Sequence, residues 1–263
     1  MSALYHEVHG TKGARDLVLL HGWSVNLRVW DGLVRQLAPH FRVITIDLPG
    51  HGGSDWDPKG STPAAQAWRV HETLASLSER YCLLGWSLGG QVALDLAAAL
   101  PAAIDRLALI GTTPRFLSGP GWRCGTPRPQ LARLIHRLYA NSERAVNDFL
   151  ALAARGSAPR TAARVLNTLR GALKTDGWAH PAALASGLAR LRDTDLRSAL
   201  PRLEVPALVM SGQRDRIVRA AAARALARRL PDARYVEIKG AAHAPFLSHP
   251  VQFARHLREF LRE

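Results

Sequence analysis

The fold is decided by Gly85-Trp86-Ser87-Leu88-Gly89, which follows the apolar run Tyr81-Cys82-Leu83-Leu84 and precedes a helical pattern over residues 91–100. This is a G-x-S-x-G pattern at a strand–turn–helix junction, where a serine hydroxyl projects from a sharp turn. The glycines two residues either side of Ser87 let the strand and the helix approach closely. The stretch therefore predicts a nucleophilic serine; the alternative is a serine that only caps the helix.

Apolar strand patterns alternate with helical patterns on both sides of this turn. Strands are expected at residues 17–21, 41–48, 81–86, 107–111, 207–211 and 235–238, with an antiparallel edge strand at 5–8. Helices are expected at residues 30–38, 64–77, 91–100 and 251–261. Because buried strands that alternate with helices form parallel sheets, the chain is predicted to be α/β, with a mostly parallel central sheet covered by helices on both faces.

This alternation stops between residues 115 and 200, where only helical patterns occur, at 131–139, 142–155, 161–174 and 181–192, with Ser142 as a helix N-cap. We therefore expect a core of residues 1–114 and 201–263 and a helical cap of residues 115–200. The cap segment holds 14 Lys and Arg against 5 Asp and Glu, a net charge of +9, whereas the rest of the chain carries +5. Codon bias toward arginine is one explanation; an acidic partner or substrate is the other.

A nucleophilic serine needs a base and a group that orients the base. Asp215 follows the strand expected at 207–211, and His243 follows the strand expected at 235–238. The carboxyl ends of parallel strands share one edge of a sheet, so both side chains are expected beside Ser87. We predict Ser87 as nucleophile, His243 as general base and Asp215 as its orienting acid. The rivals are His249 for the base and Asp193 or Asp195 for the acid.

An anion site made of backbone N–H groups should complete the catalytic set. Leu88 directly follows the nucleophile, and Trp23 follows the strand expected at residues 17–21, in His21-Gly22-Trp23-Ser24, so their N–H groups are the predicted donors. His21 is interpreted as a structural brace of this turn. Trp86 either packs beside Ser87 or contacts substrate. The apolar residues 149–153 form either a helix–helix seam or the lining of an acyl pocket.

Other classes of function lack their sequence signals. No apolar run of 18 residues occurs, and residues 1–7 lack the basic and apolar regions of a secretion signal, so we expect a cytoplasmic protein without a membrane partner. No dinucleotide-binding motif, phosphate-binding loop or Cys/His metal cluster is present, so no cofactor and no metal are expected. The positive charge comes without a nucleic-acid recognition motif, so no nucleic-acid partner is expected, and we expect a monomer.

Four motifs resemble one enzyme superfamily, from about residue 17 to the C-terminus. They are Leu19-Leu20-His21-Gly22-Trp23, Asp47-Leu48-Pro49-Gly50, Gly85-Trp86-Ser87-Leu88-Gly89-Gly90 and Ala241-Ala242-His243-Ala244-Pro245-Phe246. Together they resemble the α/β-hydrolase superfamily, whose members carry the order serine, acid, histidine. The closest resemblance is to its biotin-pathway branch of esterases, which act on the methyl ester of pimeloyl-acyl carrier protein.

The resemblance implies a serine carboxylesterase that forms an acyl-enzyme and releases methanol from a seven-carbon diacid held on acyl carrier protein. It implies substrate contacts from the triad residues Ser87 and His243 and from Trp23, Leu88, Phe149, Leu150, Ala151, Leu152 and Ala153. It also implies that cap arginines hold the acidic carrier protein. Arg144 matches such a position, Arg160 and Arg164 lie near two others, and Asp148 replaces another family arginine.

Three other functions remain open at this point. A broad-specificity carboxylesterase for small esters and a carbon–carbon bond hydrolase would use the same three catalytic residues. A binding protein on the same fold would use the pocket for a small ligand with little turnover. The complete Ser87, Asp215 and His243 set favours an enzyme.

Overall fold

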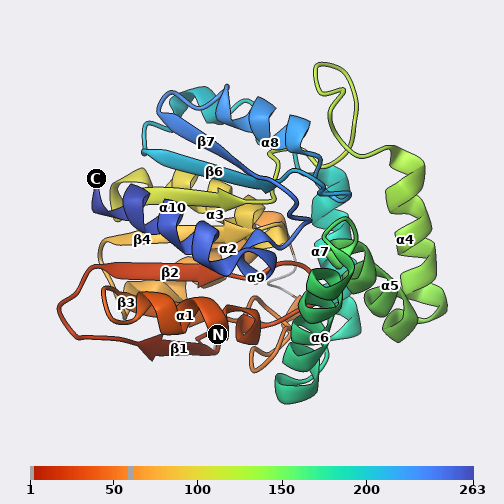
Figure 1. The fold of residues 1–263 in the computed structure, drawn as a ribbon, viewed down its shortest axis with the longest axis horizontal. Coiled ribbons are helices and arrows are strands. Elements are labelled where there is room, and N and C mark those ends of the chain that lie inside the picture. The colour runs from red at the N-terminus through yellow and green to blue at the C-terminus, as the bar shows by residue number, and fades with distance from the viewer. Residues whose placement is uncertain (1–2, 59–61) are drawn as a thin grey trace.

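Seven strands form one sheet in the computed structural model, which describes residues 3–58 and 62–263 (Figure 1). Their order across the sheet is β1-β3-β2-β4-β5-β6-β7; only the edge strand β1 runs antiparallel to its neighbour, β3. The strands are β1 (His6–His9), β2 (Asp16–Leu20), β3 (Arg42–Ile46), β4 (Tyr81–Trp86), β5 (Ile104–Ile110), β6 (Ala207–Gly212) and β7 (Ala233–Ile238). The predicted mostly parallel sheet with an antiparallel edge is confirmed.

Helices cover both faces of this sheet, as predicted. Figure 1 shows α1 (Asp31–Leu37) and α10 (Pro250–Arg262) in front of the sheet, with α2 (Pro63–Ala75) and α3 (Leu88–Ala99) behind it. The short helix α9 (Pro245–Ser248) precedes α10, and α8 (Ala220–Ala227) packs against β6 and β7. Helix α8 was not expected from the sequence, because alanines make up most of its buried face and give a weak apolar period.

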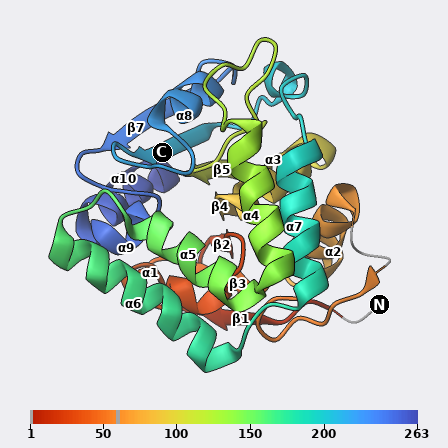
Figure 2. The same cartoon turned by 90° about the vertical axis from the view of Figure 1, so that its right-hand side faces the viewer.

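Four helices lie over the carboxyl ends of the parallel strands (Figures 1 and 2). They are α4 (Arg128–Ala140), α5 (Ser142–Ala154), α6 (Pro159–Asp176) and α7 (Pro181–Asp193), and we call this group the cap. The chain leaves the core after β5 and returns before β6, and a β-bridge pairs Arg115 with Asp195 where the two connections pass.

The N-cap of α5 differs from the sequence expectation. Asn141, and not Ser142, caps the helix, because its side chain accepts a hydrogen bond from the backbone N–H of Arg144 at 2.8 Å. Asparagine and serine are about equally good N-cap residues, so adjacent candidates cannot be separated by type alone.

Among the described residues, no helix is long and apolar enough to cross a membrane. Met1 and Ser2, which begin the stretch inspected for a secretion signal, lie outside the described residues.

Candidate active site

Ser87 lies on a sharp turn between β4 and α3. Its backbone has φ 56° and ψ −115°, in the left-handed region that is uncommon for residues other than glycine. The turn needs glycine on both sides: a Cβ on Gly85 would lie 2.4 Å from the carbonyl oxygen of Gly89, and one on Gly89 would lie 2.4 Å from that of His21. The Oγ1 of Thr112 donates to the Ser87 carbonyl at 2.7 Å. The strained turn is therefore fixed by close packing and directs the serine away from the strand.

A chain of two short hydrogen bonds joins Ser87 to an acid. The Nε2 of His243 lies 2.9 Å from Ser87 Oγ, and its Nδ1 lies 2.7 Å from Asp215 Oδ2. An ionised carboxylate can only accept, so Nδ1 carries the proton and Nε2 is free to accept from the serine hydroxyl. The three residues are 9%, 1% and 6% exposed in the order Ser87, His243, Asp215, so little water competes for these bonds. The arrangement can take a proton from the serine and return it to a leaving group.

Asp215 is held in place by its own backbone surroundings. Its Oδ1 accepts hydrogen bonds from the N–H groups of Ile217 at 2.8 Å and Val218 at 2.9 Å, which leaves Oδ2 for His243. The two rival acids lie elsewhere in ion pairs: Asp193 with Arg192, and Asp195 with Arg115 and Arg197. The rival base His249 lies beside Ser248, 2.9 Å from its Oγ.

We expect Asp215→Asn to lower kcat by about 10⁴-fold with little change in folding. The amide would favour the wrong imidazole tautomer and would no longer stabilise the charged imidazolium, while the bonds from Ile217 and Val218 could remain. Steady-state kinetics on p-nitrophenyl butyrate, with circular dichroism of the variant, make the measurement. A rate within tenfold of the wild type would move the acid role to another residue.

His243 is also positioned by residues that the sequence analysis did not assign to it. Trp86 donates from Nε1 to the carbonyl of His243 at 2.9 Å, and the N–H of His243 donates to the carbonyl of Ala153 at 3.1 Å. A Cβ on Gly111 would lie 3.3 Å from Nδ1 of the histidine. Trp86 thus acts through packing and one hydrogen bond from inside the turn that carries Ser87. The place of Trp86 in the G-x-S-x-G motif indicated that it lies near Ser87. Its hydrogen-bond partner, His243, lies 157 positions away and could not be inferred from the sequence.

Two backbone N–H groups flank the serine. A Cβ on Gly22 would lie 3.3 Å from the Cβ of Ser87, so the loop that carries Trp23 runs beside the nucleophile. Leu88 is the first residue of α3, where backbone N–H groups have no acceptor inside the helix. Among the described residues, the N–H groups of Trp23 and Leu88 have no hydrogen-bond acceptor. Both predicted donors are therefore available to an anion formed next to Ser87.

His21 stabilises the loop that carries Trp23 through two hydrogen-bond contacts. Its Nε2 accepts from the N–H of Leu48 at 2.9 Å, and its Nδ1 lies 2.8 Å from the carbonyl of Gly22. Burial, together with the nearby His51, lowers the pKa of His21 to about 3, so the ring is neutral at physiological pH. This contact fits the structural role expected from the sequence.

The apolar segment 149–153 lies in α5, whose turn spreads consecutive residues over all sides of the helix. Phe149 packs edge-on against Trp23, with ring centroids 4.8 Å apart, and Ala153 holds the backbone of His243. Phe149 and Leu152 also line a cavity of about 130 Å³ between α4 and α5. Leu150 is fully buried, and Ala151 is exposed. The structure therefore packs Phe149 on Trp23, in the loop beside Ser87, and leaves Ala151 at the surface.

The three cap arginines do not form one cluster. Arg144 lies in the first turn of α5, and Arg160 lies in the first turn of α6, beyond the other end of α5. A helical rise of 1.5 Å per residue separates these ends by about 15 Å. Arg164 donates to the carbonyls of Leu247 and Ser248, so it also ties α6 to the core close to His243.

Comparisons with known proteins find relatives along nearly the whole chain. A model of the alpha/beta hydrolase family matches residues 17–256. The chain is 43% identical to a pimeloyl-[acyl-carrier protein] methyl ester esterase of Xanthomonas oryzae pv. oryzae over 245 residues, covering 93% of this chain and 94% of the relative. It is 38% identical to the esterase of the same name from Nitrosomonas europaea, covering 96% and 97%. Among solved structures, the enol-lactonase from Burkholderia xenovorans LB400 has a TM-score of 0.84 at 29% identity, covering 99% and 96%.

Proposed function

Because the chain belongs to the alpha/beta hydrolase family, we propose that it is a serine carboxylesterase that hydrolyses the methyl ester of pimeloyl-acyl carrier protein, a step in biotin synthesis. The observation that carries the proposal is the hydrogen-bonded chain Ser87–His243–Asp215 beside two N–H groups that find no acceptor within residues 3–58 and 62–263. The names of relatives at 38–43% identity over nearly the whole chain supply the substrate.

The proposed reaction has two halves that use the same groups. His243 Nε2 takes the proton of Ser87 as Oγ attacks the ester carbon, and the N–H groups of Trp23 and Leu88 stabilise the resulting oxyanion. The tetrahedral intermediate collapses when His243 returns the proton to the methoxy oxygen, and methanol leaves. Water then attacks the acyl-enzyme with His243 as base, Ser87 regains its proton, and the free carboxylate is released. Asp215 stabilises the imidazolium in both halves.

The methyl ester lies at the end of the acyl chain farthest from the carrier, so the chain must reach Ser87 from outside. Trp23 and Leu88 flank the serine and Phe149 packs on Trp23, and these buried apolar side chains suit the methylene groups of a seven-carbon diacid. The carrier stays outside, next to a cap segment of net charge +9. Acyl carrier protein is thus both the vehicle of the substrate and the proposed partner, and we propose that the enzyme works as a cytoplasmic monomer.

We expect charge reversal on the cap to weaken capture of the carrier. Arg144→Glu combined with Arg160→Glu should raise KM for the carrier-bound ester several-fold, while kcat/KM for p-nitrophenyl butyrate stays close to the wild-type value. Added salt should slow the wild-type carrier reaction far more than the small-ester reaction, because exposed charges are screened over about 8–10 Å at near-physiological ionic strength. Arg164 is left unchanged, because its bonds to Leu247 and Ser248 give it a structural role.

The matched control reverses two exposed arginines outside the cap, Arg228 after α8 and Arg262 at the end of α10. Arg228→Glu with Arg262→Glu changes the net charge equally and should leave both KM values unchanged. If the cap and control pairs raise KM alike, overall charge and not the cap governs the reaction. If neither pair raises it, the arginines have no part in carrier binding.

The substrate is tested by comparing kcat/KM for methyl pimeloyl-carrier protein and for p-nitrophenyl butyrate. We expect a clear preference for the carrier-bound ester. A preference for the small ester would favour a broad-specificity carboxylesterase. Cleavage of a ring-fission diketone without ester turnover would favour a carbon–carbon bond hydrolase. Ligand binding without turnover of either ester would favour a binding protein.

A further inference from the structure

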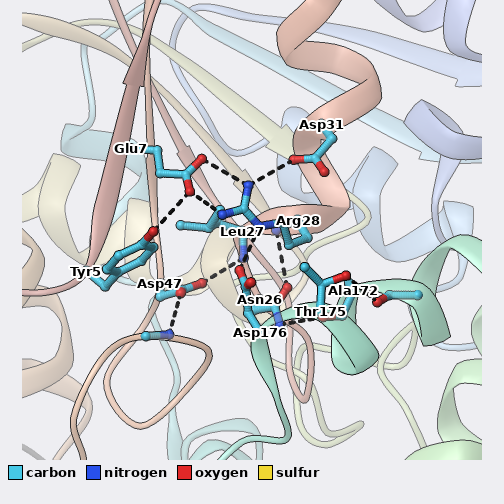
Figure 3. Close-up of polar contacts among 12 residues, drawn as sticks. Tyr5, Glu7, Asn26, Leu27, Arg28, Asp31, Asp47, Ala172, Thr175 and Asp176 are labelled. Atoms are coloured by element: carbon cyan, nitrogen blue, oxygen red, sulfur yellow. Dashed lines mark hydrogen bonds and ion pairs between the residues drawn. The ribbon is translucent and has the colours of Figure 1, made fainter.

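Arg28 lies among three carboxylates from separate parts of the chain (Figure 3). It belongs to the 3-10 helix η1 (Leu27–Trp30). Its Nε donates to Oδ2 of Asp176 at 2.7 Å, its two terminal nitrogens both donate to Glu7, and Nη1 lies 3.8 Å from Oδ1 of Asp31. Asp176 is the last residue of α6, and Glu7 lies in β1. One guanidinium thus joins a cap helix to the edge of the core sheet.

Three side chains of this cluster are mostly buried, so water screens their charges less than it would at the surface. The side chains of Arg28, Glu7 and Asp176 are 23%, 20% and 19% exposed. Burial by itself would raise the pKa of Glu7, but the hydrogen bonds from Arg28 and Tyr5 outweigh it, and the pKa is lowered. Without the guanidinium, the mostly buried carboxylates of Glu7 and Asp176 would be left as like charges beside half-exposed Asp31. The positions of these elements therefore depend on Arg28.

The residues before Arg28 are fastened to the same surroundings. The N–H of Leu27 donates to Oδ1 of buried Asp47 at 2.7 Å. The side chain of Asn26 accepts from the N–H of Arg28 at 3.2 Å and donates to the carbonyl of Ala172, in α6, at 2.9 Å (Figure 3). Residues 26–28 are thus held from the end of β3 and from the cap.

Residues 26–28 directly follow the loop that carries Trp23, whose N–H is a proposed oxyanion donor. Ser24, next to Trp23, has φ 67°, a strained conformation for a residue with a side chain. Such a conformation persists only where the surroundings hold the chain on both sides. Before it, His21 bonds to Leu48 and the Nε1 of Trp23 donates to the carbonyl of Leu184 at 2.9 Å. After it, the chain is fixed by the Arg28 cluster.

We infer that Arg28 is a positioning residue for catalysis: its ion pairs with Glu7 and Asp176 hold residues 24–28 so that the N–H of Trp23 faces the oxyanion formed beside Ser87. The inference rests on the proposed serine esterase function. It does not depend on which ester is the natural substrate.

The test is the kinetic effect of Arg28→Gln on a small ester. We expect kcat for p-nitrophenyl butyrate to fall by about 10- to 100-fold, because a misplacement of about 1 Å can cost about 10²-fold. KM should stay unchanged, since oxyanion contacts form mainly in the transition state. Affinity for a trifluoromethyl ketone, which forms a tetrahedral adduct with the serine, should fall by the same factor as kcat.

Arg42→Gln is the matched control. Arg42 is 22% exposed and donates to Oδ2 of Asp16 at 2.8 Å, but it lies at the start of β3, at the opposite end of the strand from the loop after Ile46. The Arg42→Gln variant should lower the melting temperature about as much as Arg28→Gln does and leave kcat unchanged. Arg28→Lys, which keeps the charge but loses the planar fork, should recover part of kcat, and Asp176→Asn should give a smaller loss in the same direction.

The inference is overturned if Arg28→Gln loses stability as Arg42→Gln does but keeps its kcat and its affinity for the ketone. If Arg28→Gln does not fold, wild-type kcat and ketone affinity in both Arg28→Lys and Asp176→Asn overturn it equally. Failure of the wild type to hydrolyse the carrier-bound ester would refute the proposed substrate, while the small-ester comparison would still decide the role of Arg28.

Discussion

Ser87→Ala is expected to fold as the wild type does and to lose about 10⁶-fold in kcat, the size of loss seen when a serine hydrolase loses its nucleophile. The alanine removes one oxygen from a turn whose geometry is fixed by Gly85, Gly89 and the hydrogen bond from Thr112. The backbone of the turn is therefore expected to keep its wild-type conformation. Hydrolysis of p-nitrophenyl butyrate and the circular dichroism spectrum are the two measurements.

Covalent labelling gives an independent reading of the same residue. A fluorophosphonate probe should modify the wild type at Ser87, located by peptide mass spectrometry, and should leave Ser87→Ala unmodified. Ser24, the buried serine that follows Trp23, serves as an internal comparison. Labelling of another serine, or full activity in Ser87→Ala, would exclude Ser87 as the nucleophile.

His243→Ala should cost nearly as much as the loss of the serine. Without the imidazole, Ser87 loses the proton acceptor that its Oγ has in the described part of the chain, and the leaving methoxide loses its proposed proton donor. The double variant Ser87→Ala/His243→Ala should be no slower than Ser87→Ala alone, because the two residues act as one unit. Additive losses in the double variant would show that His243 works independently of Ser87. Retained activity in His249→Ala checks that the rival histidine is not the base.

The proposed catalytic residues could be predicted from the sequence for a topological reason. Ser87, Asp215 and His243 each follow a buried strand, and parallel strands bring their carboxyl ends to one edge. The alternation of apolar runs with helical patterns predicted the sheet, its antiparallel edge and most of the helices around it. The two glycines that flank Ser87 were recognisable because a side chain on Gly85 would meet the backbone of α3, and one on Gly89 would meet the carbonyls of Leu20 and His21.

The parts that sequence reasoning missed depend on contacts between distant segments. Arg28 meets Asp176 across 148 positions, and Trp86 meets the carbonyl of His243 across 157. Neither pair leaves a local pattern, because an arginine in a short 3-10 helix looks like any exposed arginine. For the cap arginines, the sequence showed the charge but not the positions of the side chains. Their charge was visible in the composition, but helix lengths and packing place Arg144 far along α5 from Arg160 and give Arg164 partners in the core.

The central claim is that Ser87 hydrolyses a methyl ester carried on acyl carrier protein, and intact mass spectrometry of the carrier tests it most directly. Methyl pimeloyl-carrier protein is incubated with equal amounts of wild type and Ser87→Ala. We expect the wild type to convert the carrier to a species lighter by one methylene group, with one methanol released per carrier, and Ser87→Ala to leave it unchanged. An unchanged carrier in the presence of a wild type that hydrolyses p-nitrophenyl butyrate, or equal conversion by both proteins, would contradict the claim.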